Sequence, residues 1–286
     1  MNFETYGITL NLCGIRLRFE SDLPLRVSYE IEAFRTEAPP DVTAHVRDGT
    51  MRLPADRRSS GPVTMCANIG ERLFSAGKNG RESTSVVAEY CPDFSSVEVL
   101  VDAAHCGWNV RQVCKILQVF PMRELLARYD AVLLHSSRVE VDGRAIIFSA
   151  PSGTGKTTQA RLWEKYAGAR IVSNDRTIVR RIGGRFVTSG FPVDGSEPVL
   201  DPKIIPLGAI VPLRQGTENR AEHMSAGRAL AQLMEQTALN SWDSKGKTQA
   251  MLFWGDLLAE YPAILLTCRP DEGAVRCLQA ALKEEK

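Results

Sequence analysis

The sequence has almost no excess of charge and no long hydrophobic run. Its 286 residues include 35 Lys and Arg against 34 Asp and Glu, which gives a formal net charge of +1. Dedicated nucleic-acid-binding proteins usually carry a strong basic excess, and membrane-surface binders usually carry a polybasic segment. An apolar stretch such as Ala263–Cys268 is far shorter than the ~20 residues of a spanning helix. We therefore expect neither nucleic acid nor a membrane as a partner.

Paired cysteines and an export signal are also missing. The 7 cysteines are an odd number, and no two have the CxxC spacing that is typical of zinc sites and redox pairs. Residues Met1–Leu12 lack a basic segment followed by a continuous apolar stretch, which a secretory signal would have. We therefore expect reduced thiols and a cytoplasmic protein. The composition, 44% hydrophobic and 24% charged, is that of a folded protein.

The first part of the chain has the pattern of β-strands. Apolar residues alternate in Ile8–Leu12, Ile15–Phe19 and Val97–Val101, and alternation places such side chains on one face of a strand. The spacing of apolar residues in 109–129 predicts a helix that Pro121 ends or kinks. We predict a β-rich region with a linking helix over residues 1–130, and a second, catalytic domain over residues 131–286.

The second part begins with a strand, a hairpin and a glycine-rich loop. Asp142–Gly143 is a two-residue turn between apolar runs, and the run after it, Arg144–Ser149, leads directly into APSGTGKTT at 150–158. This segment fits the phosphate-binding pattern [AG]xxxxGK[ST], with alanine in place of the first glycine. A helix is predicted over about 156–167, where Gly168 would end it.

A loop of this kind holds phosphates in a specific way. Gly153 and Gly155 allow the backbone to curl so that several N–H groups and the helix N-terminus face the negative charge. Lys156 is expected to reach the outer phosphates of ATP, and Thr157 to coordinate Mg²⁺ through its hydroxyl. The expected nucleotide-binding residues are Ser152, Gly153, Thr154, Gly155, Lys156, Thr157 and Thr158.

An acidic residue follows the predicted helix. The segment Arg170–Asp175 is expected to be a parallel strand beside the strand that precedes the loop, which would bring Asp175 to the phosphates. Asp175 could then bind Mg²⁺ or accept a proton from an attacking hydroxyl. Later apolar strands do not end in an acid, and NKxD is absent. Motor, transporter and GTPase functions are therefore less favoured than a kinase.

Residues His135–Arg181 resemble the HPr serine kinase/phosphorylase superfamily, whose fold is related to ATP-dependent phosphoenolpyruvate carboxykinase. The resemblance rests on LLHSSRVEVDGRAIIFSAPSGTGKTTQARLWEKYAGARIVSNDRTIVRR, and more weakly it extends to residue 286. It is closest to the short kinases of modified-peptide gene clusters, such as those of lasso peptides. It implies an α/β fold of P-loop kinase type. Lys156, Thr157 and Asp175 then match site residues, His135 matches a histidine near the phosphates, and Glu197 matches a carboxylate on the Mg²⁺ side.

Two departures from the family pattern affect the expected chemistry. Asn174 stands where the family often has the first of two acids, so Asp175 alone would serve as the base. The glycine-rich signature near the C-terminus of true HPr kinases is missing, which argues against HPr itself as the substrate.

These observations lead to an expected function with alternatives. We expect an ATP- and Mg²⁺-dependent kinase that acts on a Ser or Thr hydroxyl of a peptide or small protein. The catalytic residues would be Asp175, His135 and Lys156, and the metal ligands Thr157, Asp175 and Glu197. The N-terminal region would dock the substrate or pair two copies as a homo-oligomer. A kinase for a small metabolite such as free serine, and a non-catalytic nucleotide-binding regulator, remain alternatives.

Overall fold

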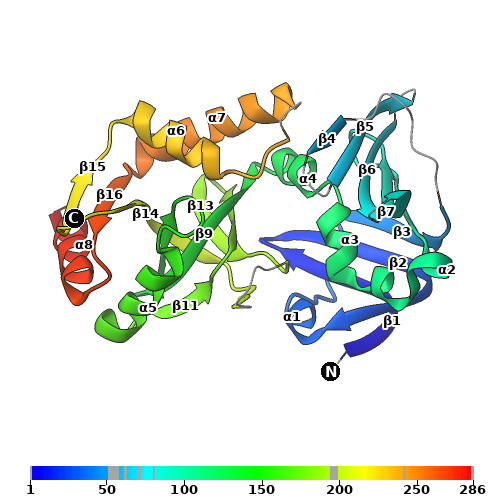
Figure 1. Ribbon diagram of the computed structural model, residues 1–286, viewed down its shortest axis with the longest axis horizontal. Helices are drawn as coiled ribbons and strands as arrows, with labels where there is room; N and C mark the ends of the chain where they lie inside the picture. The colour runs from blue at the N-terminus through cyan, green and yellow to red at the C-terminus, as the bar shows by residue number, and fades with distance from the viewer. Residues whose placement is uncertain are drawn as a thin grey trace. The chain divides into compact units, whose positions relative to one another are not determined.

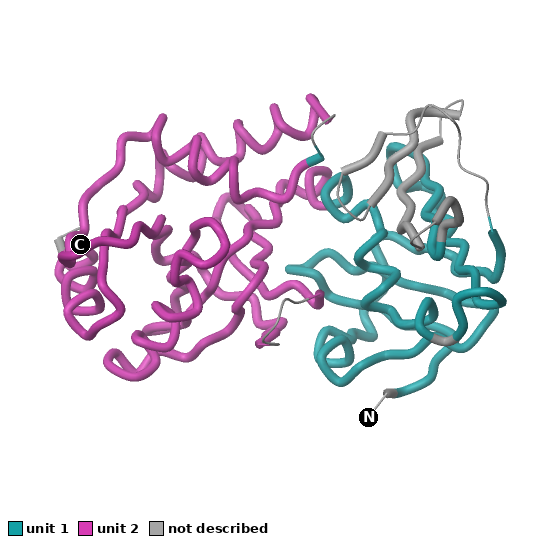
Figure 2. Tube along the Cα trace, in the orientation of Figure 1, with its two compact units in different colours: residues 1–125, 240–242 teal, residues 126–239, 243–286 magenta. Residues whose placement is uncertain are grey.

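The computed structural model describes residues 2–50, 58–60, 63–69, 72–79, 81–193, 199–240 and 243–284. The protein is a mixed α/β chain (Figure 1). It divides into two compact units, shown in different colours in Figure 2. The first unit comprises residues 1–125 and 240–242, and the second comprises residues 126–239 and 243–286. Within the described part of the chain, no helix is both long and apolar enough to cross a bilayer.

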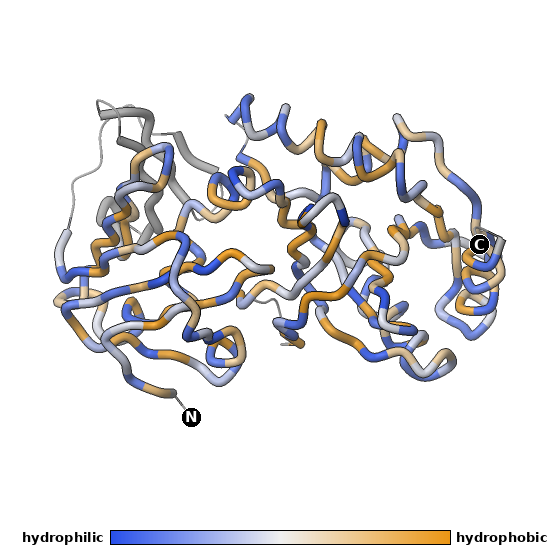
Figure 3. The backbone as a smooth tube through the Cα atoms, turned by 180° about the vertical axis from the view of Figure 1, so that it is seen from behind, coloured by the Kyte–Doolittle hydropathy of each residue, from blue (hydrophilic) through white to orange (hydrophobic). Residues whose placement is uncertain are grey.

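The first unit is built on one mixed sheet. Among the described residues this sheet has eight strands in the order β1-β2-β3-β8-β7-β6-β5-β4. The strands are β1 (Asn2–Leu12), β2 (Ile15–Ser28), β3 (Val42–Asp48), β4 (Arg58–Ser60), β5 (Val63–Ile69), β6 (Arg72–Asn79), β7 (Arg81–Tyr90) and β8 (Val97–Val101). Buried and partly exposed residues alternate along β2 and β8, as the sequence predicts for strands with one core face. Figure 3 shows this alternation of hydropathy along the strands.

The expected linking helix is broken into pieces. The helical elements of this region are α1 (Tyr29–Glu32), α2 (Ala103–Cys106), the 3-10 helix η1 (Gly107–Arg111), α3 (Val113–Val119) and α4 (Met122–Arg128). The single helix expected over 109–129 is therefore wrong, although Pro121 does break it. Gln112 is extended, at φ −72° and ψ 125°, and Phe120 leaves the helical region at ψ 140° because a proline follows it.

The second unit places a sheet between two helical layers. Its strands are β9 (Ala131–Val141), β10 (Arg144–Ser149), β11 (Arg170–Ser173), β12 (Arg176–Ile182), β13 (Arg185–Gly190), β14 (Ile205–Gln215), β15 (Arg220–His223) and β16 (Ile264–Cys268). Its helices are α5 (Lys156–Ala167), α6 (Ala226–Gln236), α7 (Ser244–Glu260) and α8 (Glu272–Glu284). In the described chain the strand order is β10-β9-β12-β13-β14-β16-β15, and β10 also pairs with β14.

Alternate residues of the same strands form the two cores of this unit. Leu134 and Ile147 pack with α6 and α7 in one cluster. Val139, Ile146 and Phe148 pack with α5 and α8 in the other. Because successive side chains of a strand point to opposite faces, β9 and β10 are buried on both sides. The predicted α/β class is thus observed, with helices on both faces of the sheet.

The predicted hairpin and helix are both confirmed. β9 and β10 pair antiparallel through Asp142 and Gly143, whose φ angles are 50° and 72°. Two positive φ angles are the mark of the tight hairpin turn for which Asp-Gly is favoured. Helix α5 ends at Gly168, which is left-handed at φ 65°. β10 therefore runs through the glycine-rich segment directly into α5.

The expected place of the segment 170–175 is wrong. β11 pairs antiparallel with β9, not with β10. β10 is already flanked on both sides, because the hairpin folds β9 against one edge and β14 pairs in parallel with the other. β9 therefore lies between β10 and β11. The register continues into β12, which pairs with the first half of β9.

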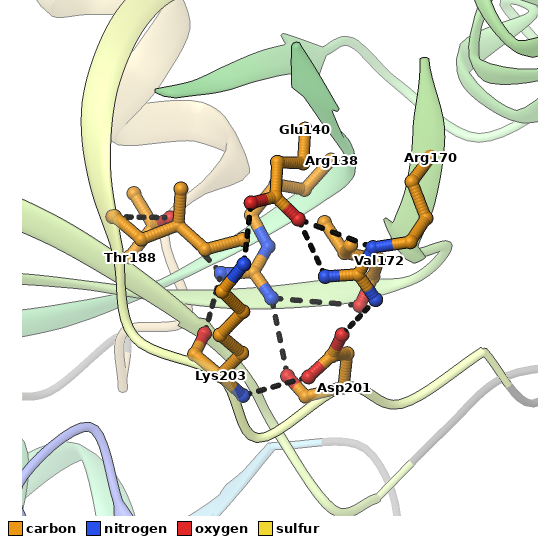
Figure 4. A network of polar contacts seen from close by, with 8 residues as sticks. Arg138, Glu140, Arg170, Val172, Thr188, Asp201 and Lys203 are labelled. Atoms are coloured by element: carbon orange, nitrogen blue, oxygen red, sulfur yellow. Dashed lines mark hydrogen bonds and ion pairs between the residues drawn. The ribbon is translucent and has the colours of Figure 1, made fainter. Parts of the chain in front are cut away.

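A buried arginine fixes the segment that precedes β14 (Figure 4). The side chain of Arg138 is fully buried and donates to Thr188 Oγ1 at 2.9 Å and to the Asp201 carbonyl at 3.1 Å. Around it, Arg170 contacts both Glu140 and Asp201. Because these donors and acceptors belong to several strands and to the 201–203 segment, the network ties that segment to the sheet.

Candidate functional site

The glycine-rich loop has the backbone that its sequence predicts. Gly153 and Gly155 have φ angles of 78° and 111°, which side chains other than glycine rarely adopt. A Cβ on Gly153 would meet nothing within 4 Å, so conformation and not space demands a glycine there. Gly155 is the N-cap of α5 and supplies no capping side chain. The first N–H groups of α5 are therefore available to an anion, as at other helix N-termini.

Lys156 is folded onto its own loop. Its ammonium donates to the carbonyl oxygens of Ala150 at 2.8 Å and Pro151 at 3.2 Å, and the residue is only 7% exposed. Burial lowers the pKa of Lys156, and the nearby charge of Asp175 partly opposes that shift. Among the described residues, the hydrogen bonds of the Lys156 ammonium go to neutral carbonyl oxygens, and a negatively charged acceptor would form stronger ones.

Asp175 and His135 meet where β9 faces the bend between β11 and β12. The Ser136 N–H donates to the Asp175 carbonyl at 3.0 Å, which fixes the backbone of the bend. Nε2 of His135 lies 3.6 Å from Oδ1 of Asp175, and Nε of Arg176 lies 3.4 Å from Oδ2. The predicted approach of Asp175 to the loop thus occurs, although by a different strand arrangement from the expected one.

The surroundings of His135 favour the uncharged form of its imidazole. Burial lowers its pKa most, and the Lys156 charge lowers it further. Asp175 and a hydrogen bond with Gln236 act in the opposite direction but do not cancel the shift. The lowered pKa of His135 therefore works against an ion pair between the ring and the Asp175 carboxylate.

One polar cavity of about 400 Å³ joins these residues. It is lined by most of the predicted site residues, namely His135, Ser152, Gly153, Gly155, Lys156, Thr157, Thr158 and Asp175. Thr154 is not among the lining residues; its N–H donates to the Pro151 carbonyl at 3.3 Å within the loop. Glu197 lies outside the described residues. Arg161 and Asn174 complete the lining.

Sequence reasoning missed two contributors to this site. Arg161 lies in the second turn of α5 and lines the cavity. Its position one helical turn after Thr157 was the only feature of the sequence that could have indicated this. Gln236, which hydrogen-bonds His135, ends α6 about a hundred residues later in the chain. It reaches β9 because the Ala238 N–H donates to the Leu133 carbonyl at 2.8 Å. No local pattern in the sequence could have indicated that contact.

The oxygen atoms that line the cavity suit a metal ion, such as Mg²⁺, that needs few protein ligands. In the described ranges, no group of three or more His, Cys, Asp or Glu side chains is arranged around a metal. The Thr157 hydroxyl and the Asp175 carboxylate do line the same cavity. Mg²⁺ commonly binds to one or two protein oxygens together with substrate phosphates and water. These two residues fit such a site, which would be completed by the phosphates of a nucleotide.

Comparison with known proteins places the chain in a family. The second unit is of the α/β class, and in it a strand runs through a glycine-rich loop into a helix. The family model described as "SynChlorMet cassette protein ScmC" matches residues 104–252, which is more than half of the chain. The chain therefore belongs to the ScmC family of SynChlorMet cassette proteins. No curated protein matches it.

Solved structures include a distant match. The HPr(Ser) kinase/phosphatase from Coxiella burnetii is 13% identical, and the match covers 54% of this chain and 99% of that chain with a TM-score of 0.30. A likeness at this level assigns neither a fold nor an activity. The arguments below therefore rest on the residues and contacts of the protein itself.

Proposed function

We propose that the protein is a kinase that transfers the γ-phosphate of ATP to a Ser or Thr hydroxyl of a peptide or small protein. The observation that carries the proposal is the presence of Lys156 and Asp175 in one polar cavity at the N-terminus of α5. The first is a cation for phosphate, and the second is a carboxylate that can accept a proton. The proposal includes membership of the HPr serine kinase/phosphorylase superfamily and action in the cytoplasm.

The loop would hold the phosphates of ATP. The N–H groups of Gly155 and the first turn of α5 would donate to phosphate oxygens, and the helix dipole would favour their charge. Lys156 would leave the carbonyls of Ala150 and Pro151 and bind an outer phosphate instead. A charged acceptor gives a stronger hydrogen bond than a neutral carbonyl, so the exchange is favourable.

Thr157 and Asp175 would hold Mg²⁺ in this cavity. The ion would supply positive charge to the phosphate oxygens, as in other phosphoryl-transfer enzymes. Glu197 was also expected on this side and keeps that role within the proposal.

Asp175 would also prepare the acceptor hydroxyl. In the proposed transfer, the hydroxyl oxygen forms a bond to the γ-phosphorus while the bond to the bridging oxygen of ADP breaks. The hydroxyl proton passes to an oxygen of Asp175. The neutral ring of His135, 3.6 Å from Oδ1, would orient that carboxylate without neutralising it.

The first unit would hold an extended peptide. A peptide can add to the edge of a sheet through main-chain hydrogen bonds. The alternating segments Ile8–Leu12 and Val97–Val101 are the two candidates for such an edge. The second lies in β8, which pairs with both β3 and β7 and offers no free edge there. β1 is at the edge, and residues 9–11 of it already bond to the segment 34–36. Within the proposal, the docking edge would therefore shift from Ile8–Leu12 to the first half of β1, where Phe3 and Tyr6 are exposed. Pairing of two copies through this edge is the alternative role of the unit.

Acceptor competition tests this proposal against the metabolite-kinase alternative. Phosphate transfer from ATP would be measured with the peptides encoded beside this gene and, separately, with free serine. The proposal expects a higher kcat/KM for a peptide, and a loss of that advantage when Tyr6→Glu places a charge on the docking edge. Tyr29→Glu, at another exposed tyrosine of the same unit, is the matched control. Faster transfer to free serine would replace the peptide kinase with a metabolite kinase. ATP binding without transfer to any acceptor would favour a regulator.

A further inference from the structure

An arginine that no sequence motif singled out lies in the wall of the candidate phosphate site. Arg161 is an exposed residue of α5, and it lines the polar cavity of about 400 Å³ together with Thr157 and Asp175. The proposed transfer uses Lys156, Thr157 and Asp175, and it leaves Arg161 without a role. The position of Arg161 on the helix and the charges around it indicate what it binds.

Arg161 lies on the same face of α5 as Thr157. The two residues are four positions apart, which is about one turn, so Arg161 is about 6 Å farther from the N-terminus of the helix. Side chains of a helix lean toward its N-terminus and cover the turn before their own Cα. A long side chain at 161 can therefore reach back over Thr157, on the side where the outer phosphates of a nucleotide and Mg²⁺ would lie.

Arg161 also decides the charge of the cavity. Lys156 and Arg161 are the lysine and arginine of its lining, and Asp175 is the carboxylate. Without Arg161, the formal charges of Lys156 and Asp175 would cancel. A cleft with an excess of positive charge attracts anions and raises their local concentration. The cavity therefore depends on Arg161 for much of its attraction to a polyphosphate.

The γ-phosphate of ATP is the group that fits Arg161 best. The inner phosphates would be held by the N–H groups of the loop and of the first turn of α5. During transfer, negative charge spreads over the three equatorial oxygens of the γ-phosphoryl group. A guanidinium presents several N–H donors in one plane, whereas the Lys156 ammonium is a point charge. Arg161 already interacts within the protein, and an arginine can keep a protein partner while another of its N–H groups donates to a phosphate oxygen.

We propose that Arg161 binds the γ-phosphate of ATP and stabilises the negative charge of the phosphoryl group during its transfer. This inference rests on the proposed kinase function and adds a residue to its site. Because ADP lacks the γ-phosphate, Arg161 should distinguish ATP from ADP. The loss of Arg161 should also slow the transfer itself.

Nucleotide binding by Arg161 variants tests the inference without an acceptor. The affinities of the full chain for ADP and for a non-hydrolysable analogue of ATP would be measured by isothermal titration in the presence of Mg²⁺. We expect Arg161→Gln to weaken binding of the analogue about ten-fold or more and binding of ADP less than about three-fold. Arg161→Lys keeps the charge without the planar donors, so its affinity for the analogue should be intermediate.

Two controls accompany these variants. Arg228→Gln changes an exposed arginine of α6 that does not line the cavity, and it should bind both nucleotides as the wild type does. Retained ADP binding in Arg161→Gln would show that this variant is folded. If circular dichroism shows it to be unfolded, Arg161→Lys decides, and a selective loss of affinity for the analogue is again the expected result.

The possible results separate this inference from the function on which it rests. The inference fails if the variants bind both nucleotides as tightly as the wild type, or if they lose as much affinity for ADP as for the analogue. Normal nucleotide binding with a raised KM for the peptide would also overturn it, because Arg161 would then contact the acceptor. A selective loss of affinity for the analogue, in a protein whose wild type phosphorylates no acceptor, would support the phosphate contact and overturn the kinase function.

Discussion

Nε2 of His135 lies 3.6 Å from Oδ1 of Asp175, in surroundings that lower the pKa of the imidazole. Burial and the Lys156 charge lower the pKa of His135, which favours the uncharged ring beside that carboxylate. A carboxylate in that condition can accept a proton or bind a cation. This relationship is the basis of the catalytic role proposed for Asp175.

Loss of the Lys156 ammonium should stop phosphate transfer. Lys156→Ala removes the cation that would bind the outer phosphates, and one well-placed charged group contributes about 3–4 kcal/mol to such a transition state. We expect kcat to fall about 100-fold or more. Lys165→Ala is the matched control, because Lys165 is an exposed lysine of the same helix. Equal rates in the two variants would show that the loop is not catalytic.

Removal of the Asp175 charge should abolish phosphate transfer but leave ATP binding intact. Asp175→Asn keeps the size of the side chain but cannot accept the proton, so we expect ATP to bind and transfer to be lost. Isothermal titration with ATP and an initial-rate assay would be run on the same preparation. Asp130→Asn, which changes the partner of Arg181, should leave both unaffected. If Asp175→Asn stays fully active and Glu197→Gln does not, the carboxylate has been assigned wrongly.

The loop conformation should depend on Gly155. Its φ of 111° is costly for alanine, so Gly155→Ala should weaken ATP binding about ten-fold or more. Gly255→Ala provides the contrast, since Gly255 lies within α7 and a Cβ there meets nothing within 4 Å. That control should be as stable as the parent or slightly more stable. Unchanged ATP affinity in Gly155→Ala would contradict the role of the loop.

Acid should destabilise the fold through His135. Its folded-state pKa lies below the ordinary value of 6.5, so the unfolded chain binds a proton that the folded chain resists. The free energy of unfolding therefore decreases as pH falls through 6.5. Urea denaturation at about pH 7.5 and about pH 5.5 would measure the loss, which should be smaller in His135→Gln. An equal loss in both proteins would mean that His135 does not resist protonation.

The Arg138 network should contribute to stability rather than to chemistry. Arg138→Met would remove the hydrogen bond that the Thr188 hydroxyl accepts and one of the two that the Asp201 carbonyl accepts, the other coming from the Gly190 N–H. We expect a loss of about 2 kcal/mol or more in the free energy of unfolding. Arg185→Met, at an exposed arginine that begins β13, should change the free energy of unfolding by less than about 0.5 kcal/mol. A neutral effect of Arg138→Met would indicate that removing a buried charge offsets the lost hydrogen bonds.

Much of the candidate site could be predicted from short segments of sequence. The Asp142–Gly143 turn, the glycine-rich loop and the helix that begins at Lys156 all depend on local backbone preferences, and the structure contains each of them. The α/β class followed from these elements. The break before Pro121 could also be predicted, because a proline restricts the residue before it. The further division of this region into short helices depends on tertiary packing, which the spacing of apolar residues does not reveal.

The strand order could not be predicted in the same way. Placing β11 beside β10 assumed that consecutive parallel strands are neighbours. The structure inserts β9 between them, because the hairpin occupies that edge first and β14 occupies the other. The contact of Gln236 with His135 and the network of Arg138 join residues far apart in the chain. Such contacts depend on the complete topology of the sheet and cannot be predicted from single segments of sequence.

A single-turnover assay would show whether the protein transfers the γ-phosphate of ATP to a peptide hydroxyl and whether Asp175 is needed for it. Enzyme in excess would be mixed with ATP labelled at the γ-phosphate and with a peptide encoded beside this gene, and the label would be located by mass spectrometry. We predict that the phosphate appears on a Ser or Thr side chain with the wild type and on no residue with Asp175→Asn. Transfer that persists at the wild-type rate in Asp175→Asn, or a wild type that binds ATP and phosphorylates no acceptor, would contradict it.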